Sequence, residues 1–497
     1  MKNNDFEFVK NKFDNAQQDV PHTLDASVIE YKLMAKEDHR RIKFDSKKPV
    51  FKLLAAAVAC LVLVLGIVFA ANPNFLNPNM VAGFDDYEEL NQKLSTLETV
   101  PQCSEMGGGI CSSVTYTTED GVEYPNIVKY YNGYIFYAYF NCNEYTTRNM
   151  VYIFKEDGTS SKLAAIIDNV DSDEYELMDI LTVNNRLIVN LSSQEITHTK
   201  IYDISNCEKP SLISEFAQSG KYSMANVIGN KLFVFTKHED ADEIPYIEQN
   251  GKKITVSSDN VVCFENVTTA RYAVINCIDI EKGAQSDYLK AVLGGSPIVH
   301  STKEYIYINE YINGEDINKP ERDVKAAMKL NVNKGRIEYA DEEEIKLYSE
   351  HVIDIGKGDG YSSHVYPIGD YYLSIGNDIE VMKDELILFD KNFNEIDKIT
   401  FDVTKLLYMY GGSLAVNDEK NVFAVPAYFI EETQRYYGAL TFEIKDGKIV
   451  IKDEFINDDE NIMYPGECVF VGDYLYSFSI NDLADDEDKL KIFAYKY

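Results

Sequence analysis

From residue 130 onward the chain alternates short apolar runs with turns of two polar or glycine residues. One phrase, a turn followed by an apolar strand, recurs seven times, and a second apolar strand follows each copy. The seven strands lie at residues 133–137, 185–189, 230–234, 303–307, 370–374, 420–424 and 473–477. Their spacings of 45 to 73 residues are typical of small repeated sheets and too long for heptads or paired-helix repeats.

Each unit contains the strands of a four-stranded antiparallel sheet. A strand leads into each turn, as in 126–131, and a third apolar strand usually follows the second, as in 395–401 or 448–455. Sheets of one type bury both faces only when they are arranged radially or in a row. The predicted fold class is therefore all-β, a seven-bladed β-propeller, with six to eight blades allowed by the irregular spacing. A pair of β-sandwiches and an open solenoid are the alternatives.

The last unit is expected to be one strand short, because the chain reaches Tyr497 directly after that unit's third strand. Residues 113–118 have the β-branched and aromatic composition of a strand and precede the first unit. We expect this stretch to complete the last unit, since closing the ring removes an open strand edge that would otherwise pair with other chains.

A long apolar segment precedes the repeats. Residues 53–71 carry no charge, and a helix of that length reaches about 28 Å, close to the thickness of a bilayer's hydrocarbon core. Many Lys and Arg residues precede the segment, and none follows it until Lys93. The positive-inside rule then predicts a single-pass protein of the cell membrane, with a cytoplasmic N-terminus and an extracellular propeller. A cleaved signal peptide is the alternative, which the long leading segment disfavours.

Four regions follow from these patterns. They are a cytoplasmic helical segment at 1–49, a transmembrane helix at 50–71, a stalk and short helix at 72–110, and the propeller at 111–497. The short helix is expected at 85–97, where Tyr87, Leu90 and Leu94 recur at helical spacing. We expect that helix to pack against the propeller.

Several phrases of the sequence carry a family resemblance. They are the helix at 84–90, the acidic lead-in at 119–129, the strand at 201–205 with Lys209-Pro210, the turn at 228–232, Ile244-Pro245-Tyr246, and the strand at 471–476. From Phe84 to its end the chain resembles bacterial secreted or membrane-anchored proteins with a C-terminal β-propeller domain distantly related to WD-type repeats. The resemblance implies the fold and a cell-surface location, and it implies no reaction. The lead-in departs from the family at 123–126, where it has fewer acidic residues.

The charge of the chain excludes one class of partner. The net charge is −34, and residues 1–52 contribute almost nothing to it. A negative field of this size repels nucleic acid and anionic lipid, and it favours cationic partners or simple solubility. No nucleic-acid partner is therefore predicted.

The search for catalytic chemistry finds no motif. The His residues are scattered, without a His-Glu-x-x-His helix, and no Gly-x-Ser-x-Gly elbow or phosphate loop occurs. Acidic clusters at 168–174, 238–243 and 482–488 are interpreted as solvated loops, with calcium at the first as the alternative. Cys103 and Cys111 could close a small loop, with free thiols as the alternative. The sequence thus predicts no enzyme activity, no cofactor and no metal site.

Insertion lengths give the remaining indication of function. Two long excursions separate the second and third strands of units three and four, at 236–270 and 310–326. Corresponding connections in a propeller emerge on one rim, and long loops on rigid scaffolds commonly carry binding sites. The candidate binding residues are polar or aromatic groups of the first excursion, namely His238, Asp240, Asp242 and Tyr246.

These observations predict a membrane-anchored binding or sensing module. Its expected partner is a protein, peptide or glycan at the cell surface. Signalling through the cytoplasmic segment is a further expectation, because the layout is similar to that of transmembrane anti-sigma regulators. The alternative is an extracellular propeller hydrolase or lyase acting on glycans, which requires carboxyl or His side chains that converge in the central channel.

Overall fold

The computed structural model of the protein describes residues 81–98, 121–142, 147–158, 160–168, 175–240, 243–268, 270–281, 283–310, 326–341, 344, 361–378, 383–391, 394–401, 405–407, 414–431, 434–457, 462, 464–481 and 484–497. The chain divides into two compact units, residues 1–76 and 77–497. The first unit, with the predicted cytoplasmic segment and transmembrane helix, lies outside the described residues. So do residues 99–120, which include the strand expected at 113–118, and residues 311–325.

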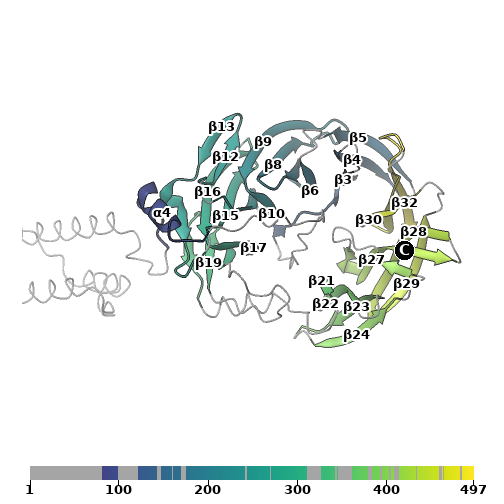
Figure 1. The fold of residues 1–497 in the computed structure, drawn as a ribbon. Coiled ribbons are helices and arrows are strands. Elements are labelled where there is room, and N and C mark those ends of the chain that lie inside the picture. The colour runs from purple at the N-terminus through teal and green to yellow at the C-terminus, as the bar shows by residue number, and fades with distance from the viewer. Residues whose placement is uncertain are drawn as a thin grey trace, which may run out of the picture. The chain divides into compact units, whose positions relative to one another are not determined.

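The described part of the second unit is built from mainly antiparallel sheets, here called sheets one to seven in the order of their main strands (Figure 1). Sheet one is β2 (Val128–Tyr131), β3 (Tyr134–Cys142), β4 (Thr147–Asp157) and β5 (Ser160–Asp168). Sheet two is β6 (Glu176–Val183), β7 (Arg186–Ser192), β8 (Ile196–Asp203), β9 (Ser211–Ser219), β12 (Tyr246–Gln249) and β13 (Lys252–Thr255). Sheet three is β1 (Val122–Glu123), β10 (Lys221–Ile228), β11 (Lys231–His238), β15 (Tyr272–Asp279), β16 (Gln285–Leu293) and β14 (Val261–Cys263).

The remaining sheets follow the same plan. Sheet four is β17 (Gly295–Ser301), β18 (Tyr305–Glu310), β19 (Ala327–Asn331) and β20 (Ile337–Tyr339), and sheet five is β21 (Tyr361–Ile368), β22 (Tyr371–Asp378), β23 (Lys383–Phe389) and β24 (Glu395–Thr400). Sheet six is β25 (Lys405–Leu407), β26 (Ala415–Asn417), β27 (Val422–Glu431), β28 (Gln434–Lys445) and β29 (Lys448–Asn457), and sheet seven is β30 (Tyr464–Val471), β31 (Tyr474–Ile480) and β32 (Leu490–Lys496). Two short 3-10 helices are η3 (Ser258–Asn260) and η4 (Asp418–Lys420).

The prediction of an all-β, propeller-like fold is confirmed. Each of the seven predicted strands falls in a different sheet, in β3, β7, β11, β18, β22, β27 and β31. Except before β18, the turns before these strands hold residues of positive φ, such as Asn132 at 50° and Gly133 at 80°, which are typical of two-residue hairpin turns. The blade count of seven stays a prediction. Sheet seven has three strands among the described residues, as the short last unit predicts.

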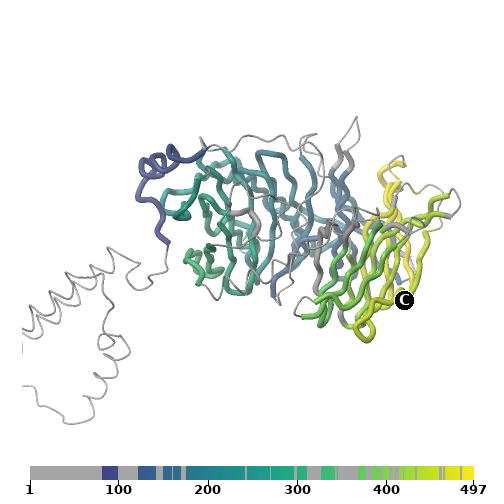
Figure 2. Tube along the Cα trace, turned by 60° about the horizontal axis from the view of Figure 1, so that its bottom comes forward, coloured from purple at the N-terminus to yellow at the C-terminus, as the bar shows by residue number. Residues whose placement is uncertain are grey.

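Neighbouring sheets pack face to face through apolar clusters. One cluster joins sheets one and two, including Phe136 and Leu187, and another joins sheets three and four, including Phe233 and Ile306. A third cluster joins the first and last sheets, where Tyr152 and Phe478 are fully buried. Figure 2 shows sheets one and seven side by side, and β5 contacts β32. The chain therefore brings its first and last sheets together.

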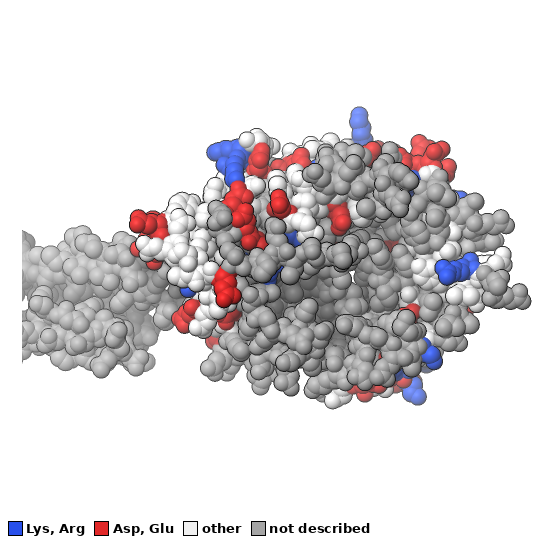
Figure 3. Space-filling model, in the orientation of Figure 1, with Lys and Arg blue, Asp and Glu red and all other residues white. Residues whose placement is uncertain are grey.

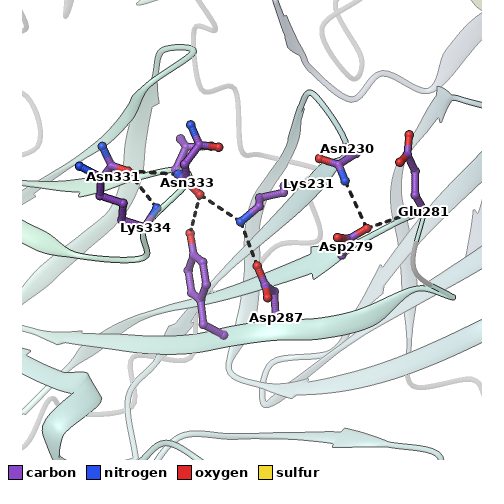
Figure 4. Close-up of polar contacts among 10 residues, drawn as sticks. Asn230, Lys231, Asp279, Glu281, Asp287, Asn331, Asn333 and Lys334 are labelled. Carbon is purple, nitrogen blue, oxygen red and sulfur yellow. Dashed lines mark hydrogen bonds and ion pairs between the residues drawn. The ribbon is translucent and has the colours of Figure 1, made fainter.

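Tyr and Lys side chains also join the sheets at their turns. At the junction of sheets three and four, Lys231 Nζ lies 2.9 Å from Asp287 Oδ2 and 3.4 Å from the carbonyl oxygen of Val332 (Figure 4). The hydroxyl of Tyr288 donates to the same carbonyl at 3.2 Å. Asn331 shapes the facing turn by accepting backbone N–H groups from 333 and 334. Tyr thus supplies the amphipathic contacts that Trp supplies in other sheets, since the chain has no Trp.

A short helix, α4 (Tyr87–Leu94), precedes the sheets. It lies within the predicted span of 85–97 and is shorter at both ends. Asp86 is its N-cap and accepts the N–H of Glu89 at 2.9 Å, while Leu90 is fully buried. The expectation that this helix packs against the sheets is correct, because Leu90 shares an apolar cluster with Ile247 and Tyr272.

The prediction of a single-pass membrane protein is not supported by the structure. No helix among the described residues is long and apolar enough to cross a membrane. Helix α4 has 8 residues, a length of about 12 Å where a bilayer core requires about 30 Å. The apolar run at 53–71, on which the prediction was based, lies outside the described residues.

Candidate functional site

The first excursion, predicted at 236–270, corresponds to the connection between β11 and β15, and it adds strands to two different sheets. Its β12–β13 hairpin extends sheet two, because β12 pairs with the last strand of that sheet, β9. Its third strand, β14, pairs in parallel with β16, the last strand of sheet three. The insertion length predicts a loop on one rim of the propeller. The structure instead places the excursion on the outer edges of sheets two and three. Edge strands carry unpaired N–H and C=O groups, which these short strands satisfy.

The hairpin ends sheet two with an open strand. Its two-residue turn has Asn250 at φ 52° and Gly251 at φ 73°, values that only Asn, Asp and Gly adopt at low cost. All four residues of β13 are exposed, and sheet two begins at this strand. Beneath it, Ile247 is fully buried. The hairpin thus has one anchored strand and one strand that faces solvent.

The helix α4 braces the hairpin from its far end. The hydroxyl of Tyr87 donates to the carbonyl of Val256 at 2.8 Å, directly after β13. The chain after the helix pairs with the end of the excursion, because Glu98 donates its N–H to Thr268 O at 2.8 Å and accepts that of Ala270 at 3.0 Å. These contacts make the excursion a fixed part of the sheet edge.

Three of the four predicted site residues, His238, Asp240 and Tyr246, lie among the described residues. His238 is buried, and its Nε2 lies 2.9 Å from the carbonyl oxygen of Glu243. Tyr246 donates its backbone N–H to Ser219 Oγ at 2.9 Å, and Lys253 Nζ lies 3.5 Å from its ring centre. Asp240 is exposed, and Asp242 lies outside the described residues. His238 and Tyr246 therefore shape the excursion, and the role of all four in binding stays a prediction.

The hairpin carries a basic patch on an acidic protein. Figure 3 shows Lys and Arg side chains where β12 and β13 lie in Figure 1, with acidic side chains around them. Lys253 is paired with Glu243 at 2.7 Å, whereas Lys252 has no ion pair among the described residues. Ile254, between Lys253 and Thr255, is 39% exposed. The open strand therefore presents one apolar side chain and one Lys that forms no ion pair with the residues that the structure describes.

A second polar site lies at the inner strands, the first strand of each sheet. Several of these strands contain a β-bulge against the second strand, two to four residues before the strand ends. The bulges lie at 177–179 in β6, 222–224 in β10, 295–299 in β17, 362–364 in β21 and 465–468 in β30. Bulges re-aim side chains and are common beside active sites. The bulges of β6 and β10 bring polar residues of two sheets together.

Asp179 lies at the bulge of β6 and is buried. Its Oδ1 accepts Asn190 Nδ2 at 2.8 Å, and its Oδ2 accepts the hydroxyl of Tyr222 from the next sheet at 2.6 Å. Burial raises the pKa of Asp179 to about 6, while the hydrogen bonds from Asn190 and Tyr222 and the charge of Lys129 oppose that rise. Burial likewise lowers the pKa of Lys129, opposed by the charges of Glu123 and Asp179.

Residues 121–127, here called the inner strap, pair with both strands that carry this site. The strap pairs with β10 through Val122 and Glu123, and it bridges Ile180 of β6 through Asn126 at 3.0 Å in both directions. The hydroxyl of Tyr124 reaches the carbonyl of Ser301 in sheet four at 3.3 Å. Lys129 Nζ donates back to the carbonyl of Tyr124 at 2.5 Å. The strap therefore crosses sheets two, three and four before β2 starts sheet one.

Asp179 and Lys129 do not form an acid–base pair that a substrate could reach. Both oxygens of Asp179 are occupied, and the Lys129 ammonium is bonded to the strap. Among the described residues, no three His, Cys, Asp or Glu side chains are placed to hold a metal ion. Cys207, Cys263, Cys277 and Cys468 are free thiols, whereas Cys103 and Cys111 lie outside the described residues. Sequence reasoning missed Asp179, whose only signal is an Asp within an apolar inner strand.

Comparisons with known proteins agree with this fold. Residues 112–349 match the family model described as "Beta propeller domain". An uncharacterized protein of Methanocaldococcus jannaschii is 30% identical over 130 residues, which is 25% of this chain and 19% of that protein. The chain thus matches about a fifth of that relative's length.

Three solved structures are similar at low identity. The acylaminoacyl peptidase of Pyrococcus horikoshii is 11% identical, with a TM-score of 0.37 over 75% of this chain and 51% of that chain. The β-propeller domain of the Trilobed protease from Pyrococcus furiosus is 11% identical, with a TM-score of 0.33 over 76% of this chain and 94% of that chain. A polysaccharide lyase, an ulvan lyase, is 8% identical, with a TM-score of 0.35 over 77% and 95%. At these scores, what the three proteins bind or cleave says nothing about this chain.

Proposed function

Residues 112–349 belong to the β-propeller domain family, and on that premise we propose that this chain is a non-catalytic protein-binding module. Its recognition surface is the outer edge of sheet two, formed by the β12–β13 hairpin and braced by α4. The observation that carries the proposal is the construction of this edge. One excursion extends two sheets, is fixed by backbone pairing, and still leaves a fully exposed strand.

Rigidity is the reason why this surface suits binding. A partner that docks on a fixed strand does not have to order it, so less conformational entropy is lost on association. The hairpin is held by buried Ile247 on one side and by the Tyr87 contact with Val256 on the other. Exposed apolar side chains within a polar surround, such as Ile254 and Tyr87, are typical of protein contact sites.

The alternative, a glycan hydrolase or lyase, needs an accessible carboxyl or His side chain. Asp179 has the altered pKa that such chemistry favours, but it is buried with both oxygens occupied. Its interactions join sheets two and three. We therefore assign Asp179 a structural role in this proposal.

Site-specific photo-crosslinking tests the proposal with a matched control. A photoreactive phenylalanine analogue replaces Ile254 in the full chain, and in a second variant it replaces Ile396 of β24. Both Ile residues are 39% exposed and belong to short outer strands. Irradiation in extracts of the source cells should give discrete protein adducts from position 254 and none from position 396. Absence of adducts at 254, or equal adducts at both positions, would contradict a recognition surface at the hairpin.

A further inference from the structure

We propose that the partner is an extended peptide segment that adds to β13 as a further strand of sheet two. The inference rests on the proposed function and specifies its partner. The segment is expected to place an apolar side chain against Ile254 and a carboxylate beside Lys252. These two partner positions lie two residues apart, because both Ile254 and Lys252 point to the same face of the strand.

Backbone geometry shows which groups of β13 are free to pair. In a hairpin with a two-residue turn, the pair that flanks the turn, Gln249 and Lys252, is hydrogen-bonded, and pairs then alternate along the ladder. Ile247 and Ile254 form the next hydrogen-bonded pair, while Lys253 and Thr255 direct their N–H and C=O groups away from β12. The bond from Val256 N–H to Pro245 O, at 2.9 Å, continues the same alternation. Lys253 and Thr255 therefore offer four backbone groups to an added strand.

The side chains of β13 favour an acidic, partly apolar segment. Ile254 shares its face with buried Ile247 and is itself 39% exposed, so an apolar partner residue extends an existing apolar layer. Lys252 lies on that face without an ion pair among the described residues. Lys253 points to the other face, where Glu243 already neutralises it. A carboxylate on the partner thus gains most beside Lys252.

The same Lys residues disfavour pairing between two copies of this chain. Antiparallel pairing of β13 with itself in the register centred on Lys253 would place that Lys opposite its counterpart, and like charges in facing positions destabilise a strand pair. The net charge of −34 adds repulsion between copies, and it also repels nucleic acid and anionic lipid. A short basic edge on an acidic protein is therefore suited to a locally acidic peptide.

The decisive variant is Thr255→Pro in the full chain, with Thr255→Ala as its control. Proline removes an N–H that points to the partner and leaves the hydrogen bonds between β12 and β13 intact, whereas alanine keeps that N–H. The probe is a fluorescein-labelled peptide of alternating Val and Thr with one Glu two residues after a Val. Fluorescence anisotropy measures its Kd. We expect Thr255→Pro to weaken binding about tenfold or more, since it removes a backbone hydrogen bond and obstructs the edge.

Two further measurements keep the test independent of folding of the variant. A peptide with N-methyl groups on the amides of one edge should lose binding to the unmodified protein. Lys252→Glu should weaken binding of the Glu peptide and improve binding of a matched Lys peptide, each by about twofold to fivefold, as for an exposed ion pair. Unchanged binding by a folded Thr255→Pro variant, or by the methylated peptide, would overturn strand addition. A second copy as the occupant, seen as Thr255→Pro-sensitive dimers in sedimentation, would also overturn it.

The two proposals fail in distinguishable ways. If adducts form at position 254 but strand-blocking changes have no effect, the recognition surface stands and the strand mode is wrong. If no adducts form at position 254 and the peptide does not bind, the recognition surface itself is wrong.

Discussion

The hydroxyl of Tyr222 in β10 lies 2.6 Å from Oδ2 of Asp179 in β6, and it donates a hydrogen bond across the junction of sheets two and three. Both residues lie at inner-strand bulges, and both are buried. The bond is charge-assisted when Asp179 is ionised, so it is stronger than a bond between neutral groups. It still does not offset the cost of burying the carboxylate, because the pKa of Asp179 is raised to about 6.

This raised pKa predicts a pH dependence of stability with a definite sign. The folded state holds the Asp179 proton more tightly than the unfolded state does. The stabilising contribution is therefore complete below the unfolded pKa, near 4, and it is lost as pH rises through about 6. A shift of about two pKa units corresponds to about 3 kcal/mol of unfolding free energy.

Urea unfolding between pH 4 and pH 7.5 measures this contribution. In the unmodified protein the free energy of unfolding should decrease between pH 4 and pH 7. In Asp179→Asn this decrease should disappear, since the group that titrates is absent. Asp203→Asn is the control, because Asp203 is only partly buried and hydrogen bonds from Ser205 lower its pKa rather than raise it. An Asp179→Asn variant whose pH profile matches that of the unmodified protein would show that Asp179 does not titrate in this range.

Tyr222→Phe tests the bond itself. Removing the hydroxyl leaves Oδ2 of buried Asp179 without its donor, so stability at pH 7.5 should fall by about 1–3 kcal/mol. The loss should be smaller at pH 4.5, where Asp179 is protonated and its charge no longer requires the donor. Equal losses at the two pH values would mean that Tyr222 acts by packing alone.

Removal of residues 483–497 tests the contact between the first and last sheets. The deletion takes away β32, which contacts β5, and with it the carbonyl of Asp486 that accepts the Tyr152 hydroxyl at 2.8 Å. We expect loss of hydrogen-exchange protection in β4 and β5 of sheet one as well as in sheet seven. If hydrogen-exchange protection in sheet one is the same with and without the deletion, the two sheets are independent.

Leu90→Ala tests the brace of the recognition edge. Leu90 is fully buried against residues of the excursion, and such a truncation costs about 2–5 kcal/mol where the site cannot collapse. Because α4 is peripheral, the loss should appear as faster hydrogen exchange in α4, β13 and β14, with sheets five and six unchanged. Leu94→Ala is the control, since Leu94 is only partly buried in the same cluster. A global decrease in stability would mean that α4 is part of the main core.

The sequence by itself determined the repeated sheets and the short helix. The strands after the seven turns are recognisable because apolar runs and turn residues act locally, through backbone preferences and burial of one sheet face. The helix at 85–97 is recognisable for the same reason, from Leu90 and its neighbours at helical spacing. These features depend on residues a few positions apart.

Only the tertiary structure decided where the excursion lies and what Asp179 contacts. In the chain the strand β12 lies between β11 and β15 of sheet three, but it pairs with β9 at the edge of sheet two. Asp179 and Tyr222 are 43 residues apart, and Tyr124 and Ser301 are 177 apart. Inner-strand bulges shift the register without leaving a pattern in the residues. Such contacts arise from packing between sheets, and no local preference of the chain encodes them.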